Sequence, residues 1–155
     1  MTRKSRKLVL VDIENPTATP TPSTKDVALV MERLGCLVLG LKEAHIVVAC
    51  SHHAPSIVAF AWPGVRHLWK SGPDGADLAL LEVLTTERVH ERFESITICS
   101  GDGIFADVAG WLGTVGVDVT VISLKGHLST RLRLAARVTH ELPIAIAAAH
   151  IGEPA

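Results

Sequence analysis

Several aspartates in this sequence follow short apolar segments, in positions where their carboxylates could act together. Asp12 comes directly after four apolar residues, and Asp102 follows an apolar run and a Ser-Gly turn. Asp77 begins an apolar segment with helical character, and Asp107 lies five residues beyond Asp102. Carboxylates that converge repel one another unless cations lie between them. We therefore expect one metal site, which is also the catalytic site, made of Asp12, Asp77, Asp102 and Asp107.

The cation that such a cluster suits is Mg²⁺ or Mn²⁺, because these hard ions prefer carboxylate oxygens and water. A divalent ion held there can polarise a phosphodiester and activate a water for attack. Single aspartates also have structural interpretations, since Asp77 and Asp107 suit the N-terminal turn of a helix. Their shared placement is what favours a joint site.

Short apolar segments alternate with amphipathic ones along the chain, which is typical of an α/β protein with a mainly parallel sheet. Strands are predicted at residues 7–11, 45–50, 65–69, 95–99, 117–122 and 138–142. Helices are predicted at residues 25–34, 56–62, 76 to as far as 93, 104–112 and 129–135, and the proline-rich residues 15–23 are predicted to form a loop. Ligands of open parallel sheets bind beyond the carboxyl ends of the strands, where the aspartates would lie.

The length of 155 residues fits one domain. We expect that domain to span residues 7–142, with a basic arm at 1–6 before it and a tail at 143–155 after it. Hydrophobic residues make up 48% of the chain and charged residues 20%, which excludes intrinsic disorder. The formal net charge of -1 excludes a generally basic protein that coats nucleic acid.

The amino-terminal apolar stretch is shorter than the roughly 7–15 apolar residues of a signal peptide. No segment approaches the roughly 20 apolar residues of a membrane span. The three cysteines are widely spaced and form neither a CxxC nor a zinc pattern. We therefore expect a cytoplasmic protein that does not associate with a membrane.

Four further residues near the expected site are candidates for contact with a substrate: Asn15, Asp74, Ser100 and Arg131. Asn15 could bond a phosphate, and it equally suits a turn before Pro16. Asp74 lies in a Pro-Asp-Gly loop, where an aspartate commonly stabilises the turn. Arg131 belongs to a late arginine-containing helix that, with the basic arm, could contact phosphates, although a solvated helix face is the ordinary interpretation.

Three short motifs, in this order and at this spacing, resemble those of NYN domains, which are PIN-like metal-dependent ribonucleases. Val11-Asp-Ile-Glu-Asn15 is similar to their VDGEN-type start, Asp74-Gly-Ala-Asp-Leu-Ala-Leu80 to their KGVDVAL segment, and Ser100-Gly-Asp-Gly-Ile-Phe105 to their SGDSDF segment. The resemblance covers about residues 7–142. It implies a three-layer PIN-like (Rossmann-like) sandwich with five or six strands, a bound Mg²⁺ or Mn²⁺, and endonucleolytic cleavage of RNA.

The acidic positions of the family and its asparagine fall on four residues of this chain: Asp12, Asn15, Asp77 and Asp102. Two positions depart from the family pattern. Ile104 stands where SGDSDF has its second aspartate, a ligand that Asp107 could replace from nearly one helical turn further on. Asp74 stands where KGVD has its lysine, which makes the expected site more acidic.

Two other functions remain open. The run Asp12-Ile-Glu14, and Gly101-Asp102 with Asp107, partly match the DxD and GDxxxxD motifs of haloacid-dehalogenase-like phosphatases, with Glu14 in place of the acid–base aspartate. The departure at Ile104 instead favours a catalytically weakened PIN-like module that binds RNA or a protein. The apolar tail after Pro143 could dock on a second copy and form a homodimer.

Overall fold

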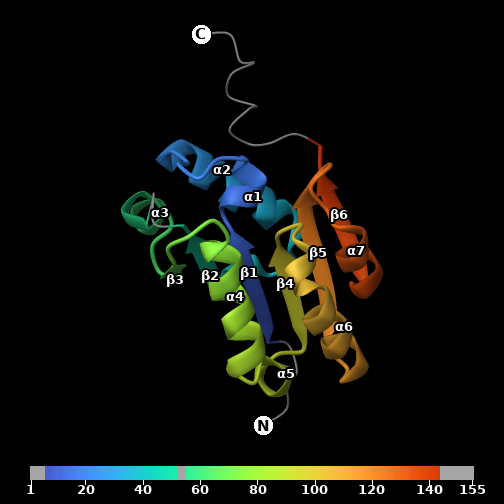
Figure 1. Cartoon of the computed structure of the whole chain (residues 1–155). Coiled ribbons are helices and arrows are strands. Elements are labelled where there is room, and N and C mark those ends of the chain that lie inside the picture. Colours follow the sequence, from blue (N-terminus) through green and yellow to red (C-terminus); the bar gives the residue numbers. More distant parts are fainter. Residues whose placement is uncertain (1–5, 52–54, 144–155) are drawn as a thin grey trace.

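A computed structural model describes residues 6–51 and 55–143 of the chain (Figure 1). The expected basic arm and tail therefore lie mostly outside the described residues. Six strands form one sheet: β1 (Lys7–Asp12), β2 (His45–Cys50), β3 (Arg66–Trp69), β4 (Ser95–Cys99), β5 (Asp118–Leu124) and β6 (Val138–Leu142). Every adjacent pair of these strands is parallel, and the order across the sheet is β3-β2-β1-β4-β5-β6. The predicted α/β class and parallel sheet are confirmed.

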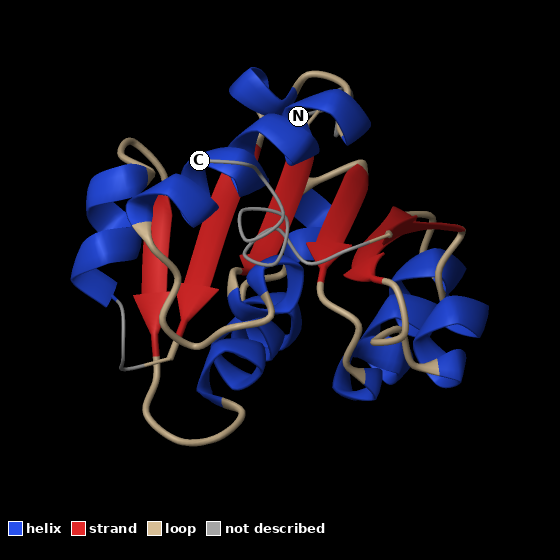
Figure 2. Cartoon of the chain, turned by 90° about the horizontal axis from the view of Figure 1, so that it is seen from above, coloured by secondary structure: helices blue, strands red, loops and turns tan. Residues whose placement is uncertain are grey.

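Helices connect the strands and cover both faces of the sheet (Figure 2). The α-helices are α1 (Glu14–Thr17), α2 (Thr24–Leu37), α3 (Pro55–Ala61), α4 (Gly75–Thr86), α5 (Val89–Arg92), α6 (Ala106–Thr114) and α7 (Thr130–Ala135). Two 3₁₀ turns, η1 (Leu41–Glu43) and η2 (Gly103–Phe105), precede β2 and α6.

The core lies in two layers because successive side chains of a strand point to opposite faces. In β1, Leu8 and Leu10 pack into one apolar cluster with α4, α6 and α7, whereas Val9 and Val11 pack into the other with α2 and α3. A strand that is covered on both faces must be apolar at every position, which is why β1 reads as a continuous apolar run. The result is a three-layer sandwich.

Local signals in the sequence explain where α2 begins. Ser23 accepts a hydrogen bond from the backbone N–H of Asp26, and the Asp26 carboxylate accepts one from the backbone N–H of Ser23. This reciprocal capping box satisfies backbone donors that have no partner within the helix. Val27, Val30 and Leu34 then repeat along the buried face of α2.

Two of the predicted elements are wrong in detail. The loop predicted for residues 15–23 begins with the short helix α1, which contains Pro16; proline is tolerated there because the first-turn N–H groups have no helical partner. The helix that was expected to run as far as residue 93 divides into α4 and α5. Arg88 interrupts it with a left-handed φ of 52°.

No helix in residues 6–51 and 55–143 is long and apolar enough to cross a membrane.

Candidate metal centre

The direction in which successive strands are added to the sheet reverses between β1 and β4, although the two strands are parallel. From β1 the chain proceeds outward through β2 and β3, returns by way of α4, and continues outward on the other side through β4, β5 and β6. Ligands of open α/β sheets bind at such a switch point, beyond the carboxyl ends of the strands. Asp12 ends β1 and Asp102 follows β4, so the topology alone brings these two residues to the crevice.

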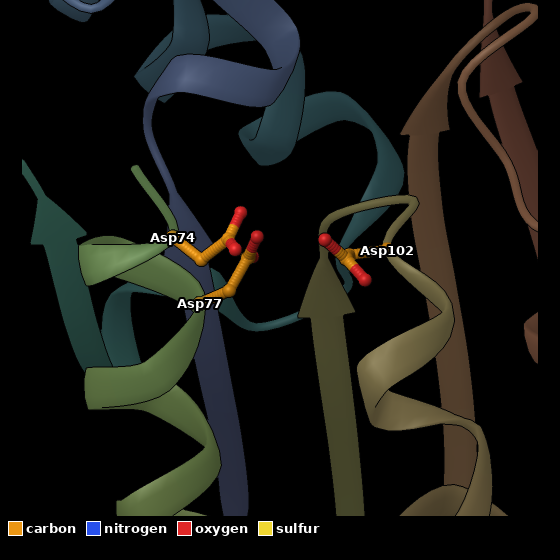
Figure 3. A group of neighbouring side chains, drawn as sticks. All are labelled: Asp74, Asp77 and Asp102. Atoms are coloured by element: carbon orange, nitrogen blue, oxygen red, sulfur yellow. The ribbon is translucent and has the colours of Figure 1, made fainter. Parts of the chain in front are cut away.

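Three carboxylates meet at this crevice (Figure 3). Asp74, Asp77 and Asp102 each offer an oxygen atom, and these atoms all lie within 4.8 Å of one another. Asp74 is the residue before α4, Asp77 lies in its first turn, and Asp102 precedes η2. Two oxygens bound to one divalent cation at about 2.0–2.6 Å lie no more than about 5 Å apart, so this spacing fits a shared cation.

Asp12 lies buried beside this group, with an exposed fraction of 7%. Its Oδ1 accepts a hydrogen bond from the backbone N–H of Glu14 at 3.0 Å. Burial, and next the negative charge of Asp77, raise the pKa of Asp12 well above its ordinary value. The interaction between the two carboxyl groups raises the pKa of Asp12 and lowers that of Asp77.

Asp77 is the central member of the cluster because it contacts the carboxyl groups on both sides. Burial, and next its hydrogen bond and charge interaction with Asp102, raise the pKa of Asp77 from 3.8 to about 6. Ser100, which is buried, donates from Oγ to Asp77 Oδ1 at 3.2 Å. The donor set thus consists of hard, crowded carboxylate oxygens, and a divalent cation bound there would relieve the repulsion between them.

The metal-free protein should lose stability as the pH rises from about 4 to above 6. A carboxyl group whose pKa is raised by folding holds a proton that the unfolded chain releases, so its stabilising effect is complete below pH 4 and lost above pH 6. Because Asp77 is partly exposed, solvent screening reduces its share to about 1 kcal/mol, or roughly 3 °C in Tm.

Thermal denaturation in EDTA between pH 4 and pH 8 measures this effect, with Asp77→Asn as the reference. The variant should show a smaller pH-dependent loss of Tm than the wild type. Parallel curves for the two proteins would contradict the raised pKa of Asp77.

Two glycines permit the elements of the crevice to approach one another. A Cβ atom on Gly75 would lie 1.9 Å from the backbone oxygen of Lys70, and one on Gly101 would lie 2.1 Å from the backbone oxygen of His127. The first contact sets the start of α4, which carries Asp77. The second sets the turn that carries Asp102.

Asn15 and Ser100 were predicted to contact a substrate, and the structure uses both within the protein. Asn15 Oδ1 accepts a hydrogen bond from the backbone N–H of Leu124 at 3.0 Å, which joins α1 to the end of β5. Ser100 Oγ orients Asp77 and also accepts from the backbone N–H of Asp102 at 3.3 Å. Both side chains therefore hold backbone segments that border the crevice.

Asp107 does not join the cluster, although it was expected to turn back toward it. The side chain is 93% exposed, and its Oδ1 accepts from Arg131 Nη2 at 2.9 Å on the surface between α6 and α7. The 3₁₀ turn η2 lies between Asp102 and α6, so Asp102 and Asp107 do not belong to one continuous α-helix, which their spacing alone did not reveal. Arg131, which was expected to contact a substrate, forms this exposed ion pair, and its contact with a substrate stays a prediction.

Two acidic residues have roles here that were not expected, since Glu14 was not among the expected metal ligands and Asp74 was expected only to contact a substrate. Glu14 Oε1 accepts a hydrogen bond from the backbone N–H of Ser51 at 2.9 Å and so links the end of β1 to the end of β2. The position of Glu14 two residues after Asp12 was the feature of the sequence that could have indicated a role near the site. Asp74 is one of the three converging carboxylates, and its spacing of three from Asp77 at a helix start was the signal there.

Comparison with known proteins supports the fold and leaves the function open. No sequence family matches the chain, and no protein of curated function matches it in sequence. In structure the chain is similar to a protein of unknown function from Vibrio parahaemolyticus, with a TM-score of 0.58 and 16% identity. That match covers 92% of this chain and 95% of the other. At this identity the similarity establishes a shared α/β fold.

Proposed function

We propose that this protein is a divalent-metal-dependent endoribonuclease whose Mg²⁺ or Mn²⁺ is held by Asp74, Asp77 and Asp102, with Asp12 buried behind Asp77. The observation that carries the proposal is the convergence of these carboxylates at the switch point of a parallel sheet. The order of the three sequence motifs, which resembles that of NYN domains, favours RNA as the substrate.

The departure at Ile104 has a structural counterpart that favours an active site. Ile104 is half-buried and packs against the apolar cluster beneath α4 and α6, so this position contributes to the core. Asp74, which stands where the family has a lysine, brings a carboxylate into the group. Relative to the family pattern, this chain lacks the aspartate at position 104 and gains a carboxylate at position 74. The number of acidic groups is therefore kept, which favours an enzyme over a module that only binds RNA or protein.

The burial of Asp12 argues against the phosphatase alternative. A phosphatase of the haloacid dehalogenase type needs an ionised aspartate that can reach the phosphorus atom of its substrate. Asp12 is 7% exposed, its pKa is raised, and it is hydrogen-bonded to Asp77. Those properties suit a residue that sets the position and charge of its neighbour.

In the proposed reaction three carboxylates share the cation and Ser100 orients one of them. Asp74 and Asp102, both exposed, and Asp77, which is partly buried, would hold the cation together. Ser100 keeps the Asp77 carboxylate in place. A divalent cation bound there would supply Lewis-acid polarisation of the phosphodiester and would stabilise charge on the leaving oxygen.

Cleavage of single-stranded and hairpin RNA by the full chain tests this proposal. Cleavage should require Mn²⁺ or Mg²⁺, stop in EDTA, and fall by at least about 100-fold in Asp102→Asn. Asp118→Asn is the matched control, because Asp118 pairs with Arg137 at the amino end of β5, at the opposite edge of the sheet. Cleavage that continues in EDTA, or that falls equally in Asp102→Asn and Asp118→Asn, would contradict the proposal.

A further inference from the structure

We propose that a second site, at the opposite edge of the sheet, binds a phosphate monoester. A cavity of about 290 Å³ opens between the amino ends of β2 and β3 and the segment that joins α4 to α5. Its lining includes three cationic side chains: Lys42, Arg66 and Arg92. His45 also borders it, and Glu87 is its one carboxylate among the described residues.

Glu87 holds the two guanidinium groups at one wall of this cavity. Arg66 Nη1 lies 2.7 Å from Glu87 Oε1, and Arg92 Nη1 lies 3.8 Å from the same oxygen and donates to the Glu87 backbone oxygen at 3.3 Å. The bond to Arg66 lowers the pKa of Glu87, so this carboxylate is ionised. Two arginines that share one acceptor are oriented in advance while part of their donor capacity remains available.

The charge of the cavity calls for an anion. Three cationic side chains and one carboxylate leave a formal excess of two positive charges with His45 neutral. The arginines are about half exposed, at 49% and 45%, and therefore remain accessible from solvent. A phosphate monoester carries close to two negative charges and three acceptor oxygens, and the planar fork of arginine matches it in geometry.

The rest of the lining fits an organic group attached to that phosphate. Leu8, Val47 and Val83 supply an apolar floor. Phe93 adds an aromatic ring, which the His45 ring meets edge-on at 5.3 Å and over which Arg92 lies at 5.0 Å. The volume lies near the lower limit of about 300 Å³ for small-molecule sites, so the ligand class is a small one such as a nucleoside monophosphate or the 5′-phosphate end of an RNA.

This site is independent of the aspartate cluster. Leu8 lies near the start of β1 and Asp12 ends it. The four residue steps from Leu8 to Asp12 span roughly 13 Å along the strand. A phosphate group held by the cationic side chains at the amino edge therefore cannot also reach the aspartate cluster, and its binding there requires no metal.

Titration calorimetry with the full chain in EDTA tests the site, with inorganic phosphate and AMP as probes. Both should bind, and Lys42→Gln combined with Arg92→Gln should weaken binding at least tenfold. The matched control is Arg131→Gln combined with Arg133→Gln, which removes the same charge from exposed ion pairs on α7 and should leave affinity unchanged. Lys42→Glu, a single exposed change, should also abolish binding.

A pair of short RNAs that differ only in a 5′-phosphate or 5′-hydroxyl identifies the source of the phosphate. Preference for the phosphorylated RNA assigns the site to RNA ends, whereas equal weak binding of both RNAs beside tight AMP binding assigns it to free nucleotides. Asp77→Asn should bind the probes like the wild type, so the outcome does not depend on the proposed nuclease activity. No binding of any probe at millimolar concentration, or equal weakening by the two double variants, would overturn the inference.

Discussion

Asp77→Asn is expected to lower metal-dependent RNA cleavage by at least about 100-fold while making the metal-free protein more stable. Asp77 contacts Asp12 on one side and Asp102 on the other, so its loss removes the group that joins the cluster. The same change removes a carboxylate whose burial and repulsion raise its pKa to about 6. Near pH 8 in EDTA, the variant should therefore melt a few degrees above the wild type.

The metal response distinguishes this result from general damage. At a Mg²⁺ or Mn²⁺ concentration of 100 times Kd, a cation that binds only the folded state adds about 2.7 kcal/mol of stability. The wild type should gain this stabilisation and Asp77→Asn should lose most of it. Asp107→Asn is the control, because its carboxylate pairs with Arg131 away from the cluster, and it should keep both cleavage and the metal response. Loss of activity in both variants would restore Asp107 to the site and contradict the arrangement described here.

Gly101→Ala is expected to destabilise the fold by about 1–3 kcal/mol or more and to reduce cleavage as well. The added Cβ would lie 2.1 Å from the backbone oxygen of His127 and 2.4 Å from Ser123 Oγ. The backbone N–H of Ser129 donates to the Gly101 oxygen at 2.8 Å, so the two loops cannot separate without losing a hydrogen bond. Overpacking at a site that cannot relax has this order of cost, and the displaced turn carries Asp102.

Denaturant unfolding of Gly101→Ala and Gly113→Ala measures the effect. Gly113 lies in the last turn of α6, where an added Cβ would have nothing within 4 Å, so alanine there should leave stability unchanged or raise it slightly. A Gly101→Ala protein as stable as the wild type would show that the segment between β5 and α7 can move away at no cost, which would contradict the prediction.

The strands were predictable because each side of this sheet is covered by helices. Leu8 to Val11 must all be apolar when alternate side chains enter different cores, and a continuous apolar run of this length is a recognisable signal. The helix α1 was missed because Pro16 is typical of a loop in sequence, although its missing N–H has no consequence in a first turn. The break at Arg88 depends on one backbone torsion that no local residue pattern announced.

The placement of Asp12 and Asp102 at one edge of the sheet was predictable from the order of residues, because both follow strands of a parallel sheet and such strands end at one edge. Which further carboxylates join them depends on packing between distant segments. The 3₁₀ turn before α6 separates Asp102 from Asp107, which pairs with Arg131, whereas the close packing of Gly75 on Lys70 brings Asp74 and Asp77 to the crevice. The edge to which a residue belongs follows from strand direction, which the alternation of strands and helices reveals. The direction of its side chain follows from helix rotation and packing, which depend on residues far away in the sequence.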